Sequence, residues 1–324
     1  MYTFEEIKNF IEKKLSEIKL KDHPRKLYFP IRYTLESGGK RIRPAMVLMA
    51  CNLFKDTIED ALSPALAIEI FHNFTLLHDD IMDNSKKRRG RDTVHQKWNS
   101  NIAILSGDAM AIKAYGLLSE TSEDKLHKVL DLFNQTALRV CEGQQLDMDY
   151  EDKDTVSEEE YLEMIELKTA VLLACSLKLG AIAGDAEESD AQNIYEFGRY
   201  LGLAFQLQDD LLDLYADPAV LGKNTGGDIV AGKKTYLYFK AYEKASAKDK
   251  QELRNLINSV SLEPEQKINQ IKVIYDSYNV FSLTSEKIYE YYKEAIKCFD
   301  NIKVSANRKE PLLNLAHYIM NRKK

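Results

Sequence analysis

Residues 71–95, FHNFTLLHDDIMDNSKKRRGRDTVH, decide how the rest of this chain is interpreted. They run from an apolar helical segment into three aspartates and then into a turn rich in lysine and arginine. Asp79 and Asp83 are four residues apart, so on a helix they lie on one face, with Asp80 about 100° round from Asp79. Like charges at this spacing destabilise a helix by roughly 0.2–0.5 kcal/mol, and a divalent cation would reverse that effect. Mg²⁺ is usually held by one or two carboxylates together with substrate phosphates, so the pattern predicts a magnesium site.

The aspartate pattern occurs a second time. Residues 205–213 read FQLQDDLLD, which places Asp209, Asp210 and Asp213 at the same spacing. A single acidic triplet is more often a solvated helix face than a binding site. Both copies lie in apolar helical segments, however, and two such faces could point at each other across a cavity. The repetition therefore favours metal binding over solvation.

Composition and charge limit the class of protein. The chain has 324 residues, of which 44% are hydrophobic, and this is enough for a large core. Its formal net charge of −6 argues against a general nucleic-acid-binding protein. The first 14 residues, MYTFEEIKNFIEKK, are amphipathic and do not resemble a signal peptide. A stretch of about 18 apolar residues, the length that spans a membrane, is absent. We expect a cytoplasmic protein.

The cysteines are far apart in sequence and form no CxxC pair, which favours reduced, mostly buried thiols over disulfides or a zinc site. They are Cys51, Cys141, Cys175 and Cys298.

Long windows without proline or glycine predict an all-α protein. Thr3 and Glu6 offer a capping box for the first helix. Helical spacing of apolar residues covers 3–20, 60–83, 102–119, 125–150, 157–184 and 191–215. Solenoid repeats, low-complexity segments and interdomain linkers are absent, so we expect one domain over residues 1–324.

A basic turn precedes the third expected helix. Residues 37–44 read SGGKRIRP. Gly38 and Gly39 end the preceding helix and let the backbone approach a ligand, and Pro44 suits the first turn of the next helix. Helix N-termini and clusters of arginine and lysine favour bound anions, so a diphosphate cradle is one interpretation. A solvated basic loop is the other.

Taken in order, these segments resemble the trans-isoprenyl diphosphate synthases, which include the farnesyl and geranylgeranyl diphosphate synthases. The combination is highly specific, whereas no single segment is. The matching segments are GGKRIRP (38–44), LLHDDIMD (76–83), RRG (88–90), TVH (93–95), GQQLDM (143–148), LKTA (167–170), FQLQDDLLD (205–213) and GKNTGGDIVAGKKT (222–235). The resemblance implies a single large antiparallel helical bundle around a central cavity.

The resemblance also implies an activity. A prenyltransferase of this family condenses isopentenyl diphosphate head to tail with an allylic diphosphate and releases diphosphate. The implied cofactor is Mg²⁺, with three ions per active site, and the implied assembly is a homodimer. The implied metal ligands are Asp79, Asp83 and Asp209, and supporting or water-mediated roles fall to Asp80, Asp210 and Asp213.

Further residues are implied to bind the two substrates. The isopentenyl diphosphate group would contact Lys40, Arg43, Arg88, Arg89 and His72. Arg41, in contrast, is expected to face solvent. The allylic diphosphate would contact Lys168, Lys223 and Lys233, with Thr169 and Gln206 near the developing allylic cation.

Two features of these segments support the implied roles. Lys168 lies shortly before the mostly apolar stretch LLACSLKLGAIAG (172–184), and burying an unpaired ammonium is expensive, so a diphosphate oxygen is its expected partner. Residues 222–235 contain several glycines, which suit a mobile lid, with Asp228 as a supporting partner of the metal site. The basic end of the chain, residues 321–324, either closes over the second substrate or is a frayed tail.

Product length depends on the residues that block the tunnel below the first aspartates. By resemblance, the bulky residue five positions before Asp79 matters, and here it is Phe74, followed by the small Thr75. This pattern favours geranylgeranyl diphosphate as the product, with farnesyl diphosphate as the alternative. On a helical wheel, however, Phe71 lies about 80° from Asp79 and Phe74 about 140° away, so Phe71 is a second candidate for the tunnel floor.

Three other interpretations compete with this one. A terpene cyclase shares the metal chemistry but has no need of the GGKRIRP and RRG segments. An inactive regulatory subunit would be expected to lose aspartates or phosphate ligands, and the principal positions are all present. A di-iron carboxylate site would need two pairs such as Glu69 with His72. Asp124 with His127 is the nearest second pair, in a polar stretch, so this interpretation is the weakest.

Overall fold

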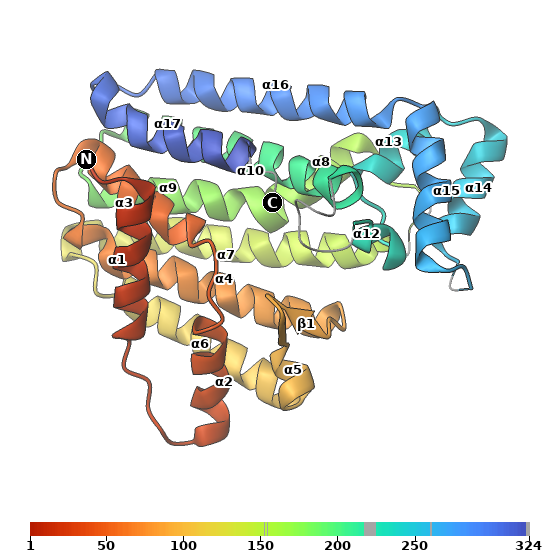
Figure 1. Ribbon diagram of the computed structural model, residues 1–324. Helices are drawn as coiled ribbons and strands as arrows, with labels where there is room; N and C mark the ends of the chain where they lie inside the picture. The colour runs from red at the N-terminus through yellow and green to blue at the C-terminus, as the bar shows by residue number, and fades with distance from the viewer. Residues whose placement is uncertain (152, 154, 217–224, 260, 322–324) are drawn as a thin grey trace. The chain divides into compact units, whose positions relative to one another are not determined.

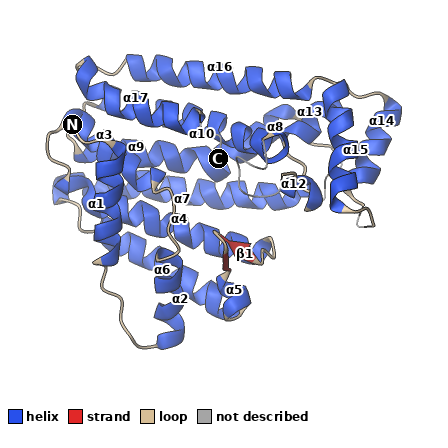
Figure 2. Ribbon diagram, in the orientation of Figure 1, coloured by secondary structure: helices blue, strands red, loops and turns tan. Residues whose placement is uncertain are grey.

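Helices make up most of the computed structural model, which describes residues 1–151, 153, 155–216, 225–259 and 261–321 (Figure 1). Within these residues the strands are limited to a two-residue pair, β1 (Lys87–Arg88) and β2 (Arg91–Asp92) (Figure 2). The prediction of an all-α protein is confirmed. The chain divides into two compact units. The first comprises Met1–Asn134, Cys175–Gln192 and Lys303–Leu313, and the second comprises Gln135–Ala174, Asn193–Ile302 and Asn314–Lys324.

The first unit is built around an apolar helix that carries the first aspartate motif at its end. This helix, α4 (Leu62–Met82), packs closely on α6 (Ser100–Leu118), because Gly107 has no side chain to collide with the His78 ring. On α1, the residues Ile7, Ile11 and Leu15 are buried, so this helix packs on the unit through one face. The helices are α1 (Phe4–Ser16), α2 (Arg25–Leu35), α3 (Ile42–Phe54), the 3₁₀ turn η1 (Glu59–Ala61), α4 (Leu62–Met82), α5 (Val94–Lys97) and α6 (Ser100–Leu118).

The second unit has its own apolar core. Tyr161, Tyr236, Phe239 and Tyr275 are buried in it. The helices that lie wholly in this unit are α8 (Glu158–Ile165), the π-helix η2 (Glu166–Ala170), α12 (Gly227–Val230), α13 (Tyr236–Lys244), α14 (Ala247–Ile257), α15 (Pro264–Ser277) and α16 (Val280–Asp300). Four helices have residues in both units: α7 (Glu123–Glu151), α9 (Val171–Ala183), α10 (Glu188–Tyr215) and α17 (Ala306–Met320).

Local signals predicted the helix starts well. The capping box between Thr3 and Glu6 is present, and Ser157 and Glu160 form another at the start of α8. Two local features were not predicted. The turn after α4 is a small antiparallel hairpin in which Arg89 has a φ of 52° and Gly90 a φ of 76°. The helix expected over 157–184 contains the π-helix η2 instead of running evenly.

The thiols agree only partly with expectation. Cys51 and Cys175 are buried, Cys298 is partly buried and Cys141 is exposed. All four are free cysteines, as predicted, but the expectation that most of them are buried was too strong. Among the described residues, none of the helices is long and apolar enough to cross a membrane.

Candidate active site

The first aspartate motif lies at the C-terminal end of α4, where the hairpin folds back on it. Asp80 is 5% exposed, and its Oδ1 accepts a hydrogen bond from Arg88 Nε at 2.7 Å. Burial raises the pKa of Asp80, although the Arg88 guanidinium opposes the shift. Asp79 and Asp83 are more exposed, and Asp79 Oδ2 lies 3.9 Å from Arg88. Asp80 therefore orients Arg88, whereas Asp79 and Asp83 are only partly buried at the end of the helix.

The hairpin also reaches the basic turn before α3. Arg89 donates a hydrogen bond to the Gly38 carbonyl, and a Cβ at Gly39 would lie 3.0 Å from the Arg89 guanidinium. Gly39 has a φ of 151°, in the region that favours glycine. A small cavity of about 30 Å³ is lined by Asp80, Arg88 and Arg89 among others. The first unit thus brings the three hairpin arginines, Arg88, Arg89 and Arg91, to one cavity, with the glycine turn against Arg89.

Lys40 and Arg43, the other two cations predicted to bind isopentenyl diphosphate, differ in their surroundings. Lys40 is exposed, whereas Arg43 Nη1 lies 3.2 Å from His72 Nε2. Burial and the nearby arginines, first of all Arg43, hold the pKa of His72 well below its usual range. A neutral His72 accepts the hydrogen bond from Arg43 and so orients that side chain.

Arg41 does not face solvent, and that prediction was wrong. Its side chain is buried, with 3% of the residue exposed. Arg41 Nε donates to Glu12 Oε1 at 2.8 Å, Nη1 donates to Glu69 Oε1, and Nη2 donates to the Leu35 carbonyl at 2.9 Å. The partners come from α1, α4 and the end of α2, so the local sequence around Arg41 does not reveal them.

The same contacts argue against the di-iron interpretation. Glu69 Oε1 also accepts a hydrogen bond from Asn73, at 2.9 Å, and His72 is engaged by Arg43. Asp124 and His127, the other pair considered, are both exposed. Glu69 is therefore the acceptor of a buried polar network.

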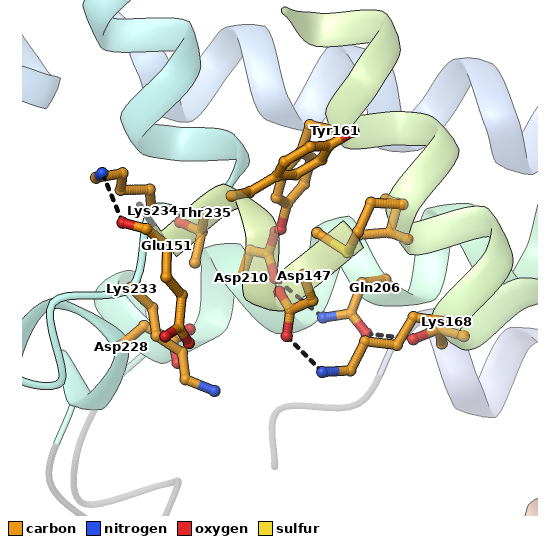
Figure 3. A pocket seen from close by; sticks show the side chains of 14 residues that line it. Asp147, Glu151, Tyr161, Lys168, Gln206, Asp210, Asp228, Lys233, Lys234 and Thr235 are labelled. Carbon is orange, nitrogen blue, oxygen red and sulfur yellow. Dashed lines mark hydrogen bonds and ion pairs between the residues drawn. The ribbon is translucent and has the colours of Figure 1, made fainter. Parts of the chain in front are cut away.

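The second unit contains a cavity of about 130 Å³ that gathers many of the residues predicted for the allylic substrate (Figure 3). Its lining includes Lys168, Thr169, Gln206, Asp210, Asp228 and Lys233. Tyr161, Lys234 and Thr235 also line it and were not predicted from the sequence, and Asp147, within the matching segment GQQLDM, lines it too. Asp209 and Asp213 lie on the same helix as Asp210 but are not among the lining residues. Lys223, also predicted to bind diphosphate, lies outside the described residues, as do residues 322–324 of the basic end.

Two residues that line the cavity belong to the π-helix η2, and a π-helix is a local widening that is frequent at functional sites. Lys168 and Thr169 lie in it. Glycines on two neighbouring helices allow its close approach: a Cβ at Gly143 would lie 2.2 Å from Lys168 N, and one at Gly202 would lie 2.6 Å from Ala170 Cα. The atoms that such a Cβ would meet, Lys168 N and Ala170 Cα, belong to the backbone, so rotating a side chain could not make room for a methyl group. Glycine inside a helical pattern was the available signal for this packing.

Lys168 has a protein partner. Its Nζ donates to Asp147 Oδ2 at 2.6 Å, and the two side chains are about equally exposed, at 24% and 25%. The ammonium is therefore not merely solvated, as predicted, but its partner in the structure is a carboxylate. A diphosphate would compete with Asp147 for the same cation.

Asp213 takes part in holding the segment that follows the second motif. Its Oδ2 accepts a hydrogen bond from Asp228 N at 3.0 Å, and its carbonyl accepts one from Gly226 N. Gly226 has a φ of 78°, and α12 begins directly after it. Lys234 Nζ, further along, donates to the Glu151 carbonyl at 3.0 Å. The described part of the expected lid, from residue 225 on, is thus tied to α10 and to the end of α7.

The donor set suits a hard cation. Burial and the neighbouring Asp228 carboxylate raise the pKa of Asp210 to about 7, although Tyr161 and Gln206 donate hydrogen bonds to it. Carboxylates that crowd one another in this way are relieved by a divalent cation. Among the residues that the structure describes, there is no group of three or more ligand side chains arranged around one point.

Aromatic side chains gather one turn and more before the first motif. The Phe71 ring lies 5.3 Å from that of Phe74 and 4.9 Å from that of Phe133, and the Phe74 ring lies 4.7 Å from that of His78. Phe71 is 3% exposed, whereas Phe74 is only partly buried. Thr75 Oγ1 donates to the His72 carbonyl at 2.8 Å. Both candidate floor residues therefore belong to one aromatic cluster.

A helical protein with two aspartate motifs, each accompanied by cationic side chains, is typical of enzymes that act on diphosphates. Comparison with known proteins defines the family. The model of the polyprenyl synthetase family matches residues 24–276, and the chain belongs to this family. It is a prenyltransferase family whose substrates are prenyl diphosphates.

The relatives agree with this assignment. The geranylgeranyl diphosphate synthase of Methanosarcina mazei is 42% identical over 249 residues, which cover 75% of this chain and 77% of that protein. A crystal structure of a geranylgeranyl pyrophosphate synthase matches with a TM-score of 0.94 and 41% identity, covering 100% of both chains. A geranylgeranyl pyrophosphate synthetase from Pyrococcus horikoshii matches with a TM-score of 0.92 and 36% identity, covering 98% of both. The predictions of the family, the helical fold and a prenyltransferase are confirmed.

Proposed function

We propose that this chain condenses isopentenyl diphosphate with an allylic diphosphate and releases diphosphate, with geranylgeranyl diphosphate as the final product. The observation that carries the proposal is the cavity of the second unit. It combines cations for a diphosphate, Lys168 and Lys233, with the uncharged oxygens of Thr169 and Gln206. The relatives named geranylgeranyl diphosphate synthase support the choice of product.

Both aspartate motifs serve the same reaction in this proposal. Asp79, Asp83 and Asp209 hold Mg²⁺, with three ions per active site. Bound Mg²⁺ supplies positive charge that stabilises the departing diphosphate. Asp80, Asp210 and Asp213 support the site through the hydrogen bonds that they accept. In this proposal residues 1–324 act as one catalytic domain.

The chain's own side chains then have distinct tasks on the allylic substrate. Lys168, Lys223 and Lys233 bind the allylic diphosphate and stabilise the charge that develops as its C–O bond breaks. Thr169 and Gln206 present oxygen atoms to the allylic cation. The apolar surroundings keep water away from that cation, which would otherwise be quenched to an alcohol.

The second substrate is bound by the first unit. Lys40, Arg43, Arg88 and Arg89 hold the diphosphate of isopentenyl diphosphate, and His72 orients Arg43. The double bond of isopentenyl diphosphate attacks the allylic cation, and the proton that is then lost passes to the departing diphosphate.

The activity is tested by measuring diphosphate release while one component at a time is omitted. We expect release to require Mg²⁺, an allylic diphosphate and isopentenyl diphosphate together. Release from an allylic diphosphate alone, with a hydrocarbon product, would identify a terpene cyclase instead. No release under any condition would identify an inactive subunit and would contradict the proposal.

Product length is assigned to the aromatic cluster on α4. Phe71 and Phe74 form the floor of the product tunnel, and the small Thr75 leaves room beside it. Replacing Phe74 by alanine removes the less buried ring, so Phe74→Ala should lengthen the product, read by chromatography of the dephosphorylated alcohols. Phe71→Ala is the paired variant. If Phe74→Ala leaves the product spectrum unchanged while Phe71→Ala lengthens it, Phe71 is the floor; if neither changes it, the assignment is wrong.

We propose that the chain forms a homodimer through α6. Large aliphatic side chains are exposed on this helix: Leu105 is 60% and Ile112 is 72% exposed, and the two are seven residues apart on one stripe. Ile112→Glu should convert a dimer to a monomer in light scattering after gel filtration. Val273→Glu, at a position on α15 that is 68% exposed, is the matched control. A wild-type chain that elutes as a monomer would contradict this proposal.

A further inference from the structure

Four side chains of the second unit form a continuous chain of hydrogen bonds beside the cavity (Figure 3). Tyr161 on α8 donates to Asp210 Oδ2 at 2.7 Å, and Gln206 Nε2 donates to Asp210 Oδ1 at 3.0 Å. Thr169 Oγ1 on η2 donates to Gln206 Oε1 at 3.1 Å. Tyr161 and Asp210 are each 4% exposed, and Thr169 is 9% exposed. Figure 3 shows the Tyr161 hydroxyl pointing toward Asp210 from the side of α8.

The two hydrogen bonds that the Asp210 carboxylate accepts give this chain a direction. A carboxylate can only accept hydrogen bonds, so both of its partners must donate. Gln206 must therefore turn its amide nitrogen to Asp210, which leaves its carbonyl oxygen for Thr169. Thr169 then donates its hydroxyl proton to Gln206, and its oxygen lone pairs are directed away from Gln206. The Tyr161 hydroxyl binds Oδ2 of Asp210 and so leaves Oδ1 for Gln206, which helps to decide which atoms of Gln206 and Thr169 line the cavity.

We propose that Tyr161 is a positioning residue for the prenyl transfer: it holds Asp210 in the rotamer that orients Gln206 and Thr169 toward the allylic cation. This inference rests on the proposed function, because the cation exists only during that reaction. Tyr161 itself does not touch the reacting atoms. Its hydroxyl contributes by removing the freedom of Asp210 to rotate, and a buried site misplaced by about 1 Å can lose roughly a hundredfold in rate.

Tyr161 could instead have a purely structural role in the core, and a comparison with Tyr236 distinguishes this role from a positioning role in catalysis. Any buried tyrosine hydroxyl needs a partner, whatever the site around it does. Tyr236 is 1% exposed, its ring lies 6.1 Å from that of Tyr161, and its hydroxyl donates to Glu158 at 3.0 Å. Glu158 is bound by Lys240 and is not connected to Asp210 by any of the bonds described. Tyr236→Phe therefore removes an equivalent bond in the same core without touching the chain of four.

The experiment compares Tyr161→Phe with Tyr236→Phe in the full-length protein under identical assay conditions. We expect Tyr161→Phe to lower kcat about tenfold or more, with the KM for isopentenyl diphosphate within about twofold of the wild type. Tyr236→Phe should keep kcat within about threefold. Equal kcat values for the two variants would overturn the proposal. Absence of activity in the wild-type chain would instead count against the proposed function.

A double variant tests whether Tyr161 acts through Gln206. If it does, Tyr161→Phe combined with Gln206→Leu should have a kcat within about threefold of that of Gln206→Leu alone. The reason is that substitutions in residues that act together do not have additive effects. Multiplying effects would show that Tyr161 acts elsewhere. Asp210→Asn serves if Tyr161→Phe does not fold, since asparagine offers one acceptor oxygen to two donors. It should lower kcat about tenfold or more while the KM for isopentenyl diphosphate stays within about twofold; a kcat within about threefold of the wild type would overturn the proposal.

Discussion

Replacing the buried Arg41 should destabilise the protein far more than a surface ion pair would. Arg41 bonds to Glu12, Glu69 and the Leu35 carbonyl, and Glu69 is 2% exposed. Burial alone would lower the pKa of Arg41, but the Glu69 and Glu12 carboxylates outweigh it and raise the pKa. Arg41→Met leaves the Glu69 carboxylate buried without its cation. Breaking such a pair costs about 3–5 kcal/mol.

Urea unfolding followed by circular dichroism measures this cost. We expect Arg41→Met to lower the free energy of unfolding by about 3–5 kcal/mol, whereas Lys272→Met, which removes a half-exposed i,i+4 pair with Asp276, should cost at most about 0.5 kcal/mol. Because the basic turn is tied to the protein through Arg41, the KM for isopentenyl diphosphate should also rise in Arg41→Met.

A second substitution isolates the buried charge as the cause. Glu69→Gln in the Arg41→Met background removes the charge and keeps the shape, so it should recover about 2 kcal/mol or more. Asn73 can still donate to the glutamine oxygen that takes the place of Glu69 Oε1. If the single variant and the double variant agree within about 0.5 kcal/mol, the uncompensated carboxylate is not the cause and the reasoning is refuted.

Three further predictions concern the metal site, the π-helix and the thiols. Asp79→Ala and Asp209→Ala should each lower turnover by orders of magnitude with the fold intact, and turnover within about threefold of the wild type, roughly 0.7 kcal/mol, would contradict their metal role. Gly143→Ala would place a methyl group 2.2 Å from a backbone nitrogen of the π-helix, so kcat should fall by about a hundredfold; unchanged kinetics would show that the helices can separate. The exposed Cys141 should react with a thiol reagent in the native protein at pH 8, whereas Cys51, whose pKa burial raises to about 12, should react only after unfolding, because it holds almost no thiolate below that pH. Equal rates of modification for the two would contradict the burial of Cys51.

Much of the fold could be predicted because it depends on local periodicity. The helix expected over residues 60–83 corresponds to η1 and α4, which ends at Met82. The hairpin after α4 could not be predicted from two-residue strands that carry only basic residues and one aspartate. The π-helix depends on Gly143 and Gly202, which approach it from other helices. Such contacts leave little trace in the segment that they shape.

In the candidate site, too, local motifs could be predicted from the sequence and distant contacts could not. Spacing and family resemblance identified Lys168, Thr169 and Gln206, which do line one cavity in the structure. The hydrogen bond from Tyr161 was missed because its acceptor is 49 residues away, and nothing near Tyr161 marks it as different from other core tyrosines. Arg41 was misjudged for the same reason, since Glu12 and Glu69 lie 29 and 28 residues from it. Motif residues are visible in the sequence, whereas the residues that hold them become visible only in the fold.

The central claim is that this chain elongates an allylic diphosphate with isopentenyl diphosphate until geranylgeranyl diphosphate is reached. Mass spectrometry of the products tests it most directly, using the purified chain with Mg²⁺, dimethylallyl diphosphate and an excess of isotopically labelled isopentenyl diphosphate. We expect geranylgeranyl diphosphate as the main product, carrying label in every added unit. Farnesyl diphosphate as the end product would contradict the assigned product length, and a failure to incorporate any label would contradict the account as a whole.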